Sequence, residues 1–424
     1  MLDIKFIREN QVMIKEMLNM RAMNVPLDRL IDYDTKRRKI ITNTQKLKHK
    51  RNLVSEKIAK MKKENKDVQK DIEEMKKISD KIANADVKIR ELGEKMQDIL
   101  LVIPNIPDKT VPYGKDESDN VEIRRWGEFP NFKFRPKDHI DLGLKLDYID
   151  MERAAKVAGS RFYYLKGNLV LLNFALIKFG LDFMRKKGFT IVQTPYMLRR
   201  DIVAGCVALS DFKDAIYKVE GEDLYLLATS EHSIAGLHKD EILGGKILPL
   251  KYAGISPCYR KEAGAHGRDT KGIFRVHQFE KVEQFTFCKP NDSWEIHELL
   301  LRNAEEILQL LNIPYRVMNV CIGDLGTVAA KKFDLEAWLP GQGKYREVVS
   351  CSNCLEYQAR RLNIRYRERP NQKPLFVHTL NSTAIATERT LIAIMENYQE
   401  KDCSIRIPKI LKPYMNGLDV IAKS

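Results

Sequence analysis

Helix-breaking residues are scarce at the start of the chain, and long apolar runs are absent throughout it. The first hundred residues contain one proline, Pro26, and one glycine, Gly93, which predicts a largely helical region. No apolar run approaches the roughly 20 residues that a membrane-spanning helix needs, so we expect no integral membrane protein. The start MLDIKFIREN lacks the apolar segment of a signal peptide, and its acids argue against a transit peptide.

Cysteines and familiar nucleotide-binding motifs are also few. The seven cysteines are scattered and odd in number, so a disulfide framework is not expected and a reducing cytosol fits better. Cys351 and Cys354 form a CxxC pair without a second Cys/His pair at zinc-ligand spacing, so we expect incidental thiols and no structural zinc. Neither a GxxxxGK[ST] loop nor a strand followed by GxGxxG is present, which excludes those two phosphate-binding motifs.

What the chain does contain is ample apolar material and a concentrated positive charge. Its 424 residues are 44% hydrophobic, enough for a core and too many for wholesale disorder, and the length predicts about two to three domains. The net charge is +15, and residues 36–66 alone carry 13 Lys and Arg against two acids. Such a segment is either a solvated helix face or an arm that binds a polyanion.

Two segments of the first hundred residues repeat apolar positions with the period of a coiled coil. In the first segment these positions recur every seven residues, at Ile40, Leu47, Val54 and Met61. In the second they alternate steps of three and four, at Met75, Ile78, Ile82, Ala85, Ile89, Leu92, Met96 and Ile99. The polar stretch between them predicts a tip turn. We therefore expect an antiparallel two-helix coiled-coil arm over about 28–100, preceded by a short amphipathic helix over 1–20.

A domain boundary is expected near 103–120, because three prolines and a glycine fall within 104–114. This divides the chain into an N-terminal domain, 1–105, and a second domain, 106–424. In the second domain, β-branched and aromatic runs predict strands at 189–195, 223–229, 251–260, 277–287, 315–320 and 345–353. Helices are predicted at 168–187, 230–240, 290–311 and 384–399. Consecutive strands with helices between them indicate an α+β domain built on an antiparallel sheet flanked by helices.

The segment CYRKEAGAHGRDTKGIFRVHQFEKVEQFTF, residues 258–287, carries the clearest chemical signal. Arg260 and Arg275 flank a loop rich in glycine and basic residues, including Arg268 and Lys271, which suits a bound phosphate. Alternation along the returning strand puts Phe279 and Glu283 on one face. An aromatic face beside a carboxylate suits a purine nucleotide. Taken alone, the segment is equally compatible with a charged, exposed hairpin.

The same segment resembles motif 2 of class II aminoacyl-tRNA synthetases, in the form found in seryl-tRNA synthetases. LLATSEHSIAGLH (226–238) resembles the serine loop of that family, and REVVSCSNCLEYQARRLNIRYRE (346–368) resembles the signature before motif 3. LNSTAIATERTLIAIMENYQ (380–399) resembles motif 3. The coiled coil matches the family's tRNA-binding arm, so the resemblance covers essentially the whole chain. Asn-Ser-Thr at 381–383 replaces the usual bacterial Asn-Gly-Ser and resembles the archaeal and eukaryotic branch.

The resemblance implies a set of site residues. For serine they are Thr229, Glu231, Arg260, Glu283, Asn381 and Thr383. For ATP they are Arg260, Glu262, Arg275, Val276, Phe279, Glu347, Ser350 and Arg389. Arg260 and Arg389 would be the catalytic cations, acting on the α-phosphate and the γ-phosphate. Glu347 and Ser350 would hold the Mg²⁺ that accompanies ATP.

Within the two substrate sets, the resemblance gives individual roles. Thr229 and Glu231 would hold the serine ammonium group, and Glu283 and Thr383 its hydroxyl. Phe279 would stack on adenine, Glu262 would hold the adenine amino group, and the main chain at Val276 would read the edge of the base.

The implied function is ATP-dependent ligation of L-serine to tRNA(Ser) through seryl-adenylate, by a cytoplasmic homodimer that uses no membrane; tRNA(Sec) stays open as a second acceptor. Residues 168–195 match motif 1, which forms the dimer interface of the family. We expect that interface at an apolar stripe of Leu169, Leu172, Leu176, Phe179 and Phe183. Three alternatives are a paralogue that binds tRNA without charging it, a class II ligase for threonine or proline, and a homologue that loads carrier proteins.

Overall fold

The computed structural model describes residues 1–207, 215–262 and 271–423. The chain divides into two compact units, Leu2–Pro104 and Asn105–Ser424 together with Met1, and each is described by itself. Among the described residues, no helix combines the length and the apolar character required to cross a bilayer.

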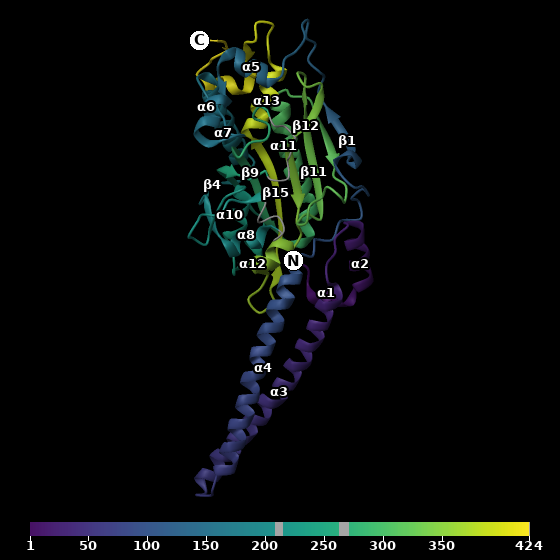
Figure 1. Ribbon diagram of the computed structural model, residues 1–424, viewed down its shortest axis with the longest axis vertical. Coiled ribbons are helices and arrows are strands. Elements are labelled where there is room, and N and C mark those ends of the chain that lie inside the picture. Colours follow the sequence, from purple (N-terminus) through teal and green to yellow (C-terminus); the bar gives the residue numbers. More distant parts are fainter. Residues whose placement is uncertain (208–214, 263–270, 424) are drawn as a thin grey trace. The chain divides into compact units, whose positions relative to one another are not determined.

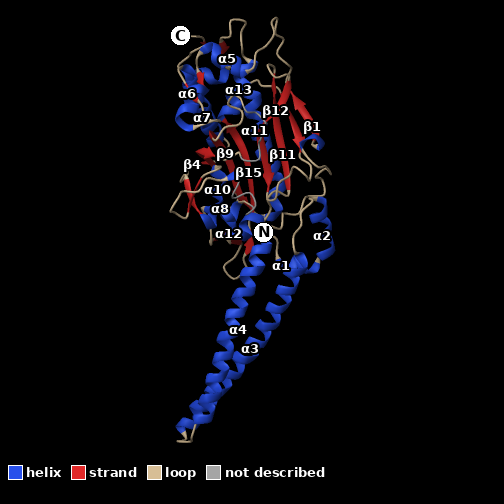
Figure 2. Ribbon diagram, in the orientation of Figure 1, coloured by secondary structure: helices blue, strands red, loops and turns tan. Residues whose placement is uncertain are grey.

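All the regular secondary structure of the first unit is helical (Figure 2). Its helices are α1 (Ile4–Glu9), α2 (Gln11–Met20), α3 (Leu27–Lys63) and α4 (Gln69–Leu100). The prediction of a single helix over 1–20 is wrong, because the chain breaks at Asn10. That residue leaves helical geometry (φ −127°, ψ 38°), and its side-chain amide donates to the Phe6 carbonyl at 2.9 Å, which ends α1.

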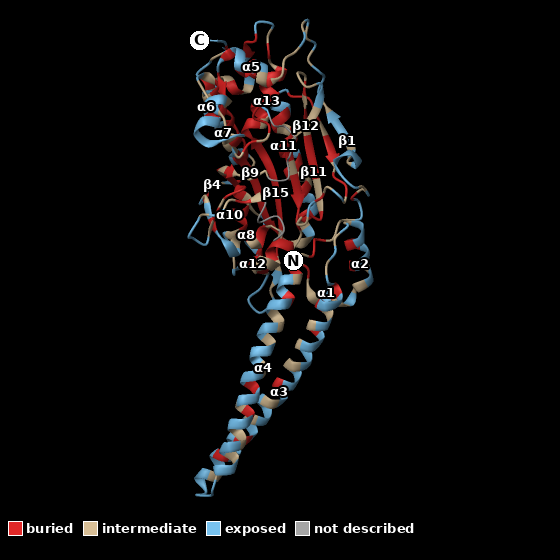
Figure 3. Ribbon diagram, viewed as in Figure 1, coloured by how far each residue is buried: buried red, intermediate tan, exposed pale blue. Residues whose placement is uncertain are grey.

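The two long helices, α3 and α4, run side by side in opposite directions, joined by a short turn (Figure 1). Val54 and Ile58 of α3 pack against Ile78 and Ile82 of α4 in one buried cluster. Thr44 is also buried in α3, where its hydroxyl group donates a hydrogen bond to the Ile40 carbonyl at 2.8 Å. Most of the remaining surface of both helices is exposed (Figure 3). The pair is therefore held by a narrow apolar seam, and its basic side chains lie in solvent.

The second unit is built on an eight-stranded sheet. Its order is β1 (Val121–Trp126), β10 (Tyr315–Asn319), β11 (Lys331–Leu339), β12 (Lys344–Asn353), β15 (His378–Ala386), β9 (Gln278–Cys288), β8 (Leu250–Tyr259) and β4 (Thr190–Gln193). Every neighbouring pair is antiparallel except β8 and β4. The α+β fold class with an antiparallel sheet is thus confirmed.

Short strands and helices complete the second unit. The other strands are β2 (Ile149–Asp150), β3 (Tyr164–Leu165), β5 (Met197–Arg199), β6 (Leu224–Leu226), β7 (Ile242–Gly244), β13 (Arg365–Arg367), β14 (Leu375–Phe376), β16 (Ile405–Arg406) and β17 (Val420–Ile421). The helices are α5 (His139–Leu146), α6 (Met151–Ala158), α7 (Asn168–Lys186), α8 (Arg200–Cys206), α10 (Ser230–Gly236), α11 (Ser293–Leu310), α12 (Tyr357–Leu362) and α13 (Thr387–Asn397).

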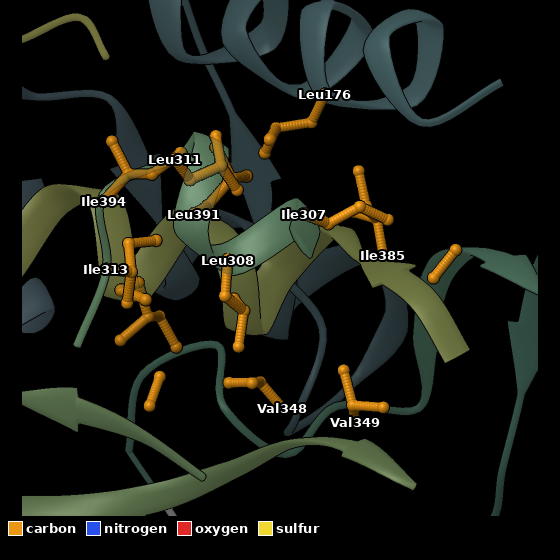
Figure 4. Close-up of a cluster of buried hydrophobic side chains, with 14 of the residues drawn as sticks. Leu176, Ile307, Leu308, Leu311, Ile313, Val348, Val349, Ile385, Leu391 and Ile394 are labelled. Carbon is orange, nitrogen blue, oxygen red and sulfur yellow. The ribbon is translucent and has the colours of Figure 1, made fainter. Parts of the chain in front are cut away.

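The main core forms where α7, α11 and α13 pack against the sheet (Figure 4). Leu176, Ile307 and Leu391 are fully enclosed there. The apolar stripe of α7 that the sequence assigns to a subunit interface belongs to this core instead, since all five of its side chains are buried within the unit. What α7 exposes is the opposite face, where Leu171 is 53% and Phe174 is 58% accessible.

Strand register places the site residues. In the β8–β9 ladder Phe279 faces Cys258 and Glu283 faces Gly254, and in the β15–β9 ladder Thr383 faces Glu283. Because side chains alternate across a strand, Phe279 and Glu283 point to the same side of β9. The sheet thereby brings residues about one hundred positions apart in sequence into a single row.

Candidate active site

A cavity of about 460 Å³ opens over β9, β12 and β15, next to α10 and the start of α13. All thirteen residues that the sequence proposes for the site line this cavity. They are Thr229, Glu231, Arg260, Glu262, Arg275, Val276, Phe279, Glu283, Glu347, Ser350, Asn381, Thr383 and Arg389. Segments that are far apart in sequence therefore converge on one volume, as a single binding site requires.

One end of the cavity carries Thr229 and Glu231. Thr229 caps α10, with its side-chain oxygen accepting from the Glu231 amide at 3.3 Å. The Glu231 carboxylate accepts a hydrogen bond from the Gln358 amide at 2.8 Å. Burial and the neighbouring charge of Glu283 raise the pKa of Glu231 to about 7. Among the described residues this carboxylate forms no ion pair, although Lys281 and Arg260 favour its charge, and a ligand ammonium group would supply a direct partner.

Beside that carboxylate lies Glu283, buried in β9. Its Oε2 atom is 2.5 Å from the Lys281 ammonium and 3.5 Å from the Thr383 hydroxyl, which donates to it. Burial raises the pKa of Glu283, while Lys281 and Arg260 oppose that shift. Asn381 completes this end and donates its amide to the Cys354 sulfur at 3.6 Å. The end is small, polar and able to hydrogen-bond a hydroxyl group.

Arg260 lies between the two halves of the cavity, at the end of β8. Its Nε donates to the Ala228 carbonyl at 3.2 Å, and its guanidinium carbon lies 5.0 Å from the centre of the Phe279 ring. Beyond it, Glu262 and Arg275 form an ion pair of 2.9 Å across the base of the loop. Glu262 has a left-handed backbone (φ 52°), which turns the chain out of the strand direction.

The opposite end of the cavity is cationic. Arg389 donates to the Glu347 carbonyl at 2.9 Å and pairs with its carboxylate at 3.2 Å. The ring of Phe274 lies between Arg389 and Arg346, with guanidinium carbons 4.7 and 3.8 Å from the ring centre. Both guanidinium groups therefore lie within cation–π distance of one ring, and Arg389 places positive charge in the cavity wall, which suits recognition of phosphate oxygens.

A set of oxygen donors lies beside Arg389 on β11 and β12. Ser350 hydrogen-bonds to Asp334, whose Oδ1 atom is buried without a hydrogen-bond partner among the described residues, and Asp334 interacts electrostatically with Glu347. Desolvation disfavours the charged form of Glu347, but the neighbouring cations Arg389 and Lys332 outweigh this effect and lower the pKa of Glu347. Carboxylate and hydroxyl oxygens are ligands that Mg²⁺ prefers. Among the described residues no three His, Cys, Asp or Glu side chains form a metal cluster by themselves. The donor set therefore fits a Mg²⁺ ion that arrives with phosphate oxygens.

Several residues of the cavity wall have no counterpart in the sequence-based set. They are Cys206, Val207, His232, Ile273, Phe274, Lys281, 325–329, Val348, Ser352, Cys354, Ala386 and Glu388. Lys281 could have been found from the alternation of β9, since it lies two residues from both Phe279 and Glu283. Arg268 of the predicted phosphate loop lies outside the described residues, and Lys271 is exposed.

The two cysteines of the CxxC pair have different surroundings. Cys354 accepts the Asn381 hydrogen bond in the cavity wall, whereas the Cys351 thiol is buried in β12, 3.8 Å from the His297 carbonyl. Burial raises the pKa of both thiols. Both are therefore neutral thiols at neutral pH.

Comparisons with known proteins identify the family of the chain. Residues 1–107 match the model of the seryl-tRNA synthetase N-terminal domain, and residues 216–398 match the class II tRNA synthetase core domain (G, H, P, S and T). The serine--tRNA ligase of Nitrosopumilus maritimus is 51% identical over 98% of this chain and 99% of its own length. That of Pyrococcus horikoshii is 50% identical over 99% and 98%.

Two solved structures cover the whole chain. One is the seryl-tRNA synthetase of Pyrococcus horikoshii complexed with ATP, with a TM-score of 0.93, 50% identity and 100% of both chains covered. The other is the cytoplasmic serine-tRNA ligase of Naegleria fowleri in complex with AMP, with a TM-score of 0.87, 39% identity and coverage of 100% and 99%. The two domain matches and the half-identical relatives of nearly equal length lead to one conclusion: this chain belongs to the seryl-tRNA synthetase family.

Proposed function

We propose that this chain ligates L-serine to tRNA(Ser) in two ATP-dependent steps. The serine carboxylate attacks the α-phosphorus of ATP and pyrophosphate leaves. The terminal ribose hydroxyl of the tRNA then attacks the carbonyl carbon of seryl-adenylate, and AMP leaves. The observation that carries this proposal is the polarity of the cavity, with the carboxylates of Glu231 and Glu283 at one end and Arg389 beside the Phe274 ring at the other.

The proposed roles follow from that polarity. Glu231 and Thr229 receive the serine ammonium group, Glu283 and Thr383 its hydroxyl, and Arg260 both the carboxylate and the α-phosphate. Phe279 stacks on adenine, with Glu262 on its amino group, while Arg389 receives the γ-phosphate. Phosphoryl transfer of this kind needs positioned charge more than acid–base chemistry, and the cavity supplies positioned charge.

Mg²⁺ bound with ATP would neutralise phosphate charge when present. Glu347 and Ser350 are the proposed ligands, and the unpartnered oxygen of Asp334 lies in the same donor set. Arg389 holds the Glu347 carboxylate in place at 3.2 Å, so this ligand is oriented before ATP arrives.

The proposed role of the first unit, residues 1–105, is to bind tRNA, and that of residues 106–424 is catalysis. Within 36–66 eleven of the thirteen basic side chains are exposed, and they are carried on an exposed pair of helices, as a coiled-coil arm that grips a phosphate backbone would require. A protein that charges tRNA is expected in the cytoplasm. Whether tRNA(Sec) is a second acceptor is to be tested.

The proposed assembly is a homodimer. The support is the apolar surface that α7 leaves uncovered, with Leu171 and Phe174 more than half accessible. Sedimentation equilibrium should give a mass near twice 49.1 kDa at micromolar concentration. A single species at the monomer mass would contradict the dimer.

The experiment that tests the function is amino-acid-dependent exchange of pyrophosphate with ATP, run with serine beside the other nineteen amino acids. We expect exchange with serine and far less with threonine, proline or alanine. A paralogue that only binds tRNA would give none, and a threonine or proline ligase would give exchange with its own substrate. Either result would refute the proposal.

A further inference from the structure

Lys281 is a buried cation inside the cavity that the proposed reaction leaves without a role. It lies on β9 between Phe279 and Glu283 and lines the same wall, with 8% of its side chain accessible. Its ammonium group is 2.5 Å from Glu283 Oε2, and the Glu283 side chain is 2% accessible. Buried ammonium and carboxylate groups are costly to keep charged unless they are paired. The pair therefore has to be considered as one unit.

The groups around Glu283 offer few other charges. Glu231 of α10, Cys258 of β8 and Cys351 of β12 interact electrostatically with it, and His232 of α10 lines the same cavity and interacts with Lys281. Burial lowers the pKa of His232 to about 3 and raises the pKa of both thiols, so these three are neutral. The charge of Glu231 is of the same sign as that of Glu283. Among the described residues, Lys281 and Arg260 are the cations that favour the Glu283 carboxylate.

The two oxygens of Glu283 are used unequally. Lys281 and Thr383 both approach Oε2, whereas no described residue donates a hydrogen bond to Oε1. A carboxylate held from one side keeps the other oxygen available as an acceptor. If Glu283 were protonated, one of its oxygens would become a donor, and the hydrogen bond that it forms would lose its charge assistance.

We propose that Lys281 is a specificity-determining positioning residue, which holds Glu283 as a carboxylate with Oε1 free to accept the hydroxyl of serine. This inference rests on the proposed function. Lys281 acts through Glu283 and is not proposed to contact the reacting atoms. Its removal leaves the buried carboxylate of Glu283 beside the partly buried carboxylate of Glu231, with Arg260 as their remaining neighbouring cation among the described residues. One of them must then take up a proton near neutral pH.

The test compares serine with alanine, because both amino acids carry the ammonium and carboxylate groups but only serine has the hydroxyl. The ratio of their kcat/KM values in pyrophosphate exchange cancels any contribution of Glu231, Arg260 or ATP binding. We expect this ratio to stay flat between pH 6 and pH 9 in the unmodified enzyme. In Lys281→Met it should fall at least about fivefold at pH 6.5 and recover as the pH rises. Lys281→Arg should keep the flat profile.

Two further measurements separate this role from a structural one. In a Glu283→Gln background, Lys281→Met should no longer change the ratio, because the group through which Lys281 acts has gone. Thermal unfolding and ATP binding of each variant report its folding, and Lys281→Gln replaces Lys281→Met if the latter is unfolded. A serine/alanine ratio that stays flat with pH in folded Lys281→Met, or in Lys281→Gln where that variant replaces it, would overturn the inference. If the unmodified enzyme fails to activate serine at all, the proposed function has failed instead.

Discussion

Arg260 lies where the serine end and the nucleotide end of the cavity meet. Its orientation is fixed by the Ala228 carbonyl and the face of Phe279, so the guanidinium group is ready before either substrate binds. Charge that develops on the α-phosphate in the transition state would meet a cation that needs no rearrangement. A residue in this position should matter for the rate with any amino acid that enters.

Replacing Arg260 with alanine should therefore raise the activation free energy of adenylate formation by about 3 kcal/mol, which lowers kcat/KM roughly a hundredfold. Exchange kinetics with serine would measure this loss. Arg302→Ala is a matched control, since Arg302 is exposed on α11 and does not line the cavity. Equal activity in the two variants would remove Arg260 from the chemistry.

Thr383→Val tests the hydroxyl pocket, because it keeps the shape of the side chain and removes its hydrogen bond to Glu283. The KM for serine should rise by a factor of about five to thirty, or roughly 1–2 kcal/mol, and the preference for serine over alanine should narrow. The KM for ATP should not change. Thr390→Val is the control, since Thr390 is equally buried on α13 but donates to the Ala386 carbonyl. An unchanged serine/alanine ratio in Thr383→Val would show that Thr383 does not contact the hydroxyl.

The pH dependence of serine binding should reflect Glu231, whose pKa is raised to about 7 by burial and by Glu283. The ionised form is the one that pairs with an ammonium group, so binding below that pH must displace a proton. The KM for serine should rise as the pH falls below about 7, by up to about tenfold per pH unit. Glu231→Gln should bind serine weakly at every pH, without this slope. A KM that stays constant from pH 5.5 to 8.5 would contradict the assignment.

At the scale of elements, periodicity located the parts that carry a regular pattern. The stripe of α7 and the alternation of β9 predicted those elements within a residue or two of their ends. β11, Lys331–Leu339, was missed although Phe333, Leu335 and Ala337 alternate with charged residues in the ordinary pattern of a strand with one apolar face. The prediction that the apolar stripe of α7 forms a subunit interface is wrong, because the sequence pattern of an apolar face is the same whether that face packs on the chain's own sheet or on another subunit.

The cavity shows the same division between local and nonlocal information. Its thirteen predicted residues came from motifs, whose spacing is local. Cys206 and the segment 325–329 reach the wall only through the packing of α8 and the loop before β11, and no local pattern marks them, whereas His232 directly follows Glu231 within the motif at 226–238. Lys281 had a local pattern, but a lysine in a strand is usually a solvated side chain.

The helical pair α3 and α4 makes a prediction of its own. Five exposed lysines of its basic segment form no ion pair with any described residue: Lys39, Lys46, Lys60, Lys62 and Lys63. The first four are chosen for substitution. Changing all four to glutamine should weaken tRNA binding and reduce its salt dependence, with the slope falling by about one for each lysine that contacts a phosphate. Serine-dependent exchange should stay the same, because it needs no tRNA.

The matched control for the arm changes four exposed lysines that are already paired with acids, Lys36, Lys48, Lys50 and Lys57. Their loss should weaken tRNA binding less. If neither set alters tRNA binding, the basic segment is only a solvated helix face.

At the scale of the whole molecule, the chain combines a basic helical unit with a second unit whose cavity we propose as the catalytic site. On that proposal the two steps of the reaction are separable, because activation depends on the cavity and transfer depends also on the tRNA. Full-length relatives that are about 50% identical support the two units acting as one enzyme.

The most direct test of this account measures serine attached to tRNA by the purified chain. Labelled serine, ATP and tRNA(Ser) are incubated together, and acid-precipitable serine is counted with and without ATP. The account predicts ATP-dependent esterification of tRNA with serine and none with alanine or threonine at equal concentration. Tight tRNA binding with no serine attached under these conditions would contradict it.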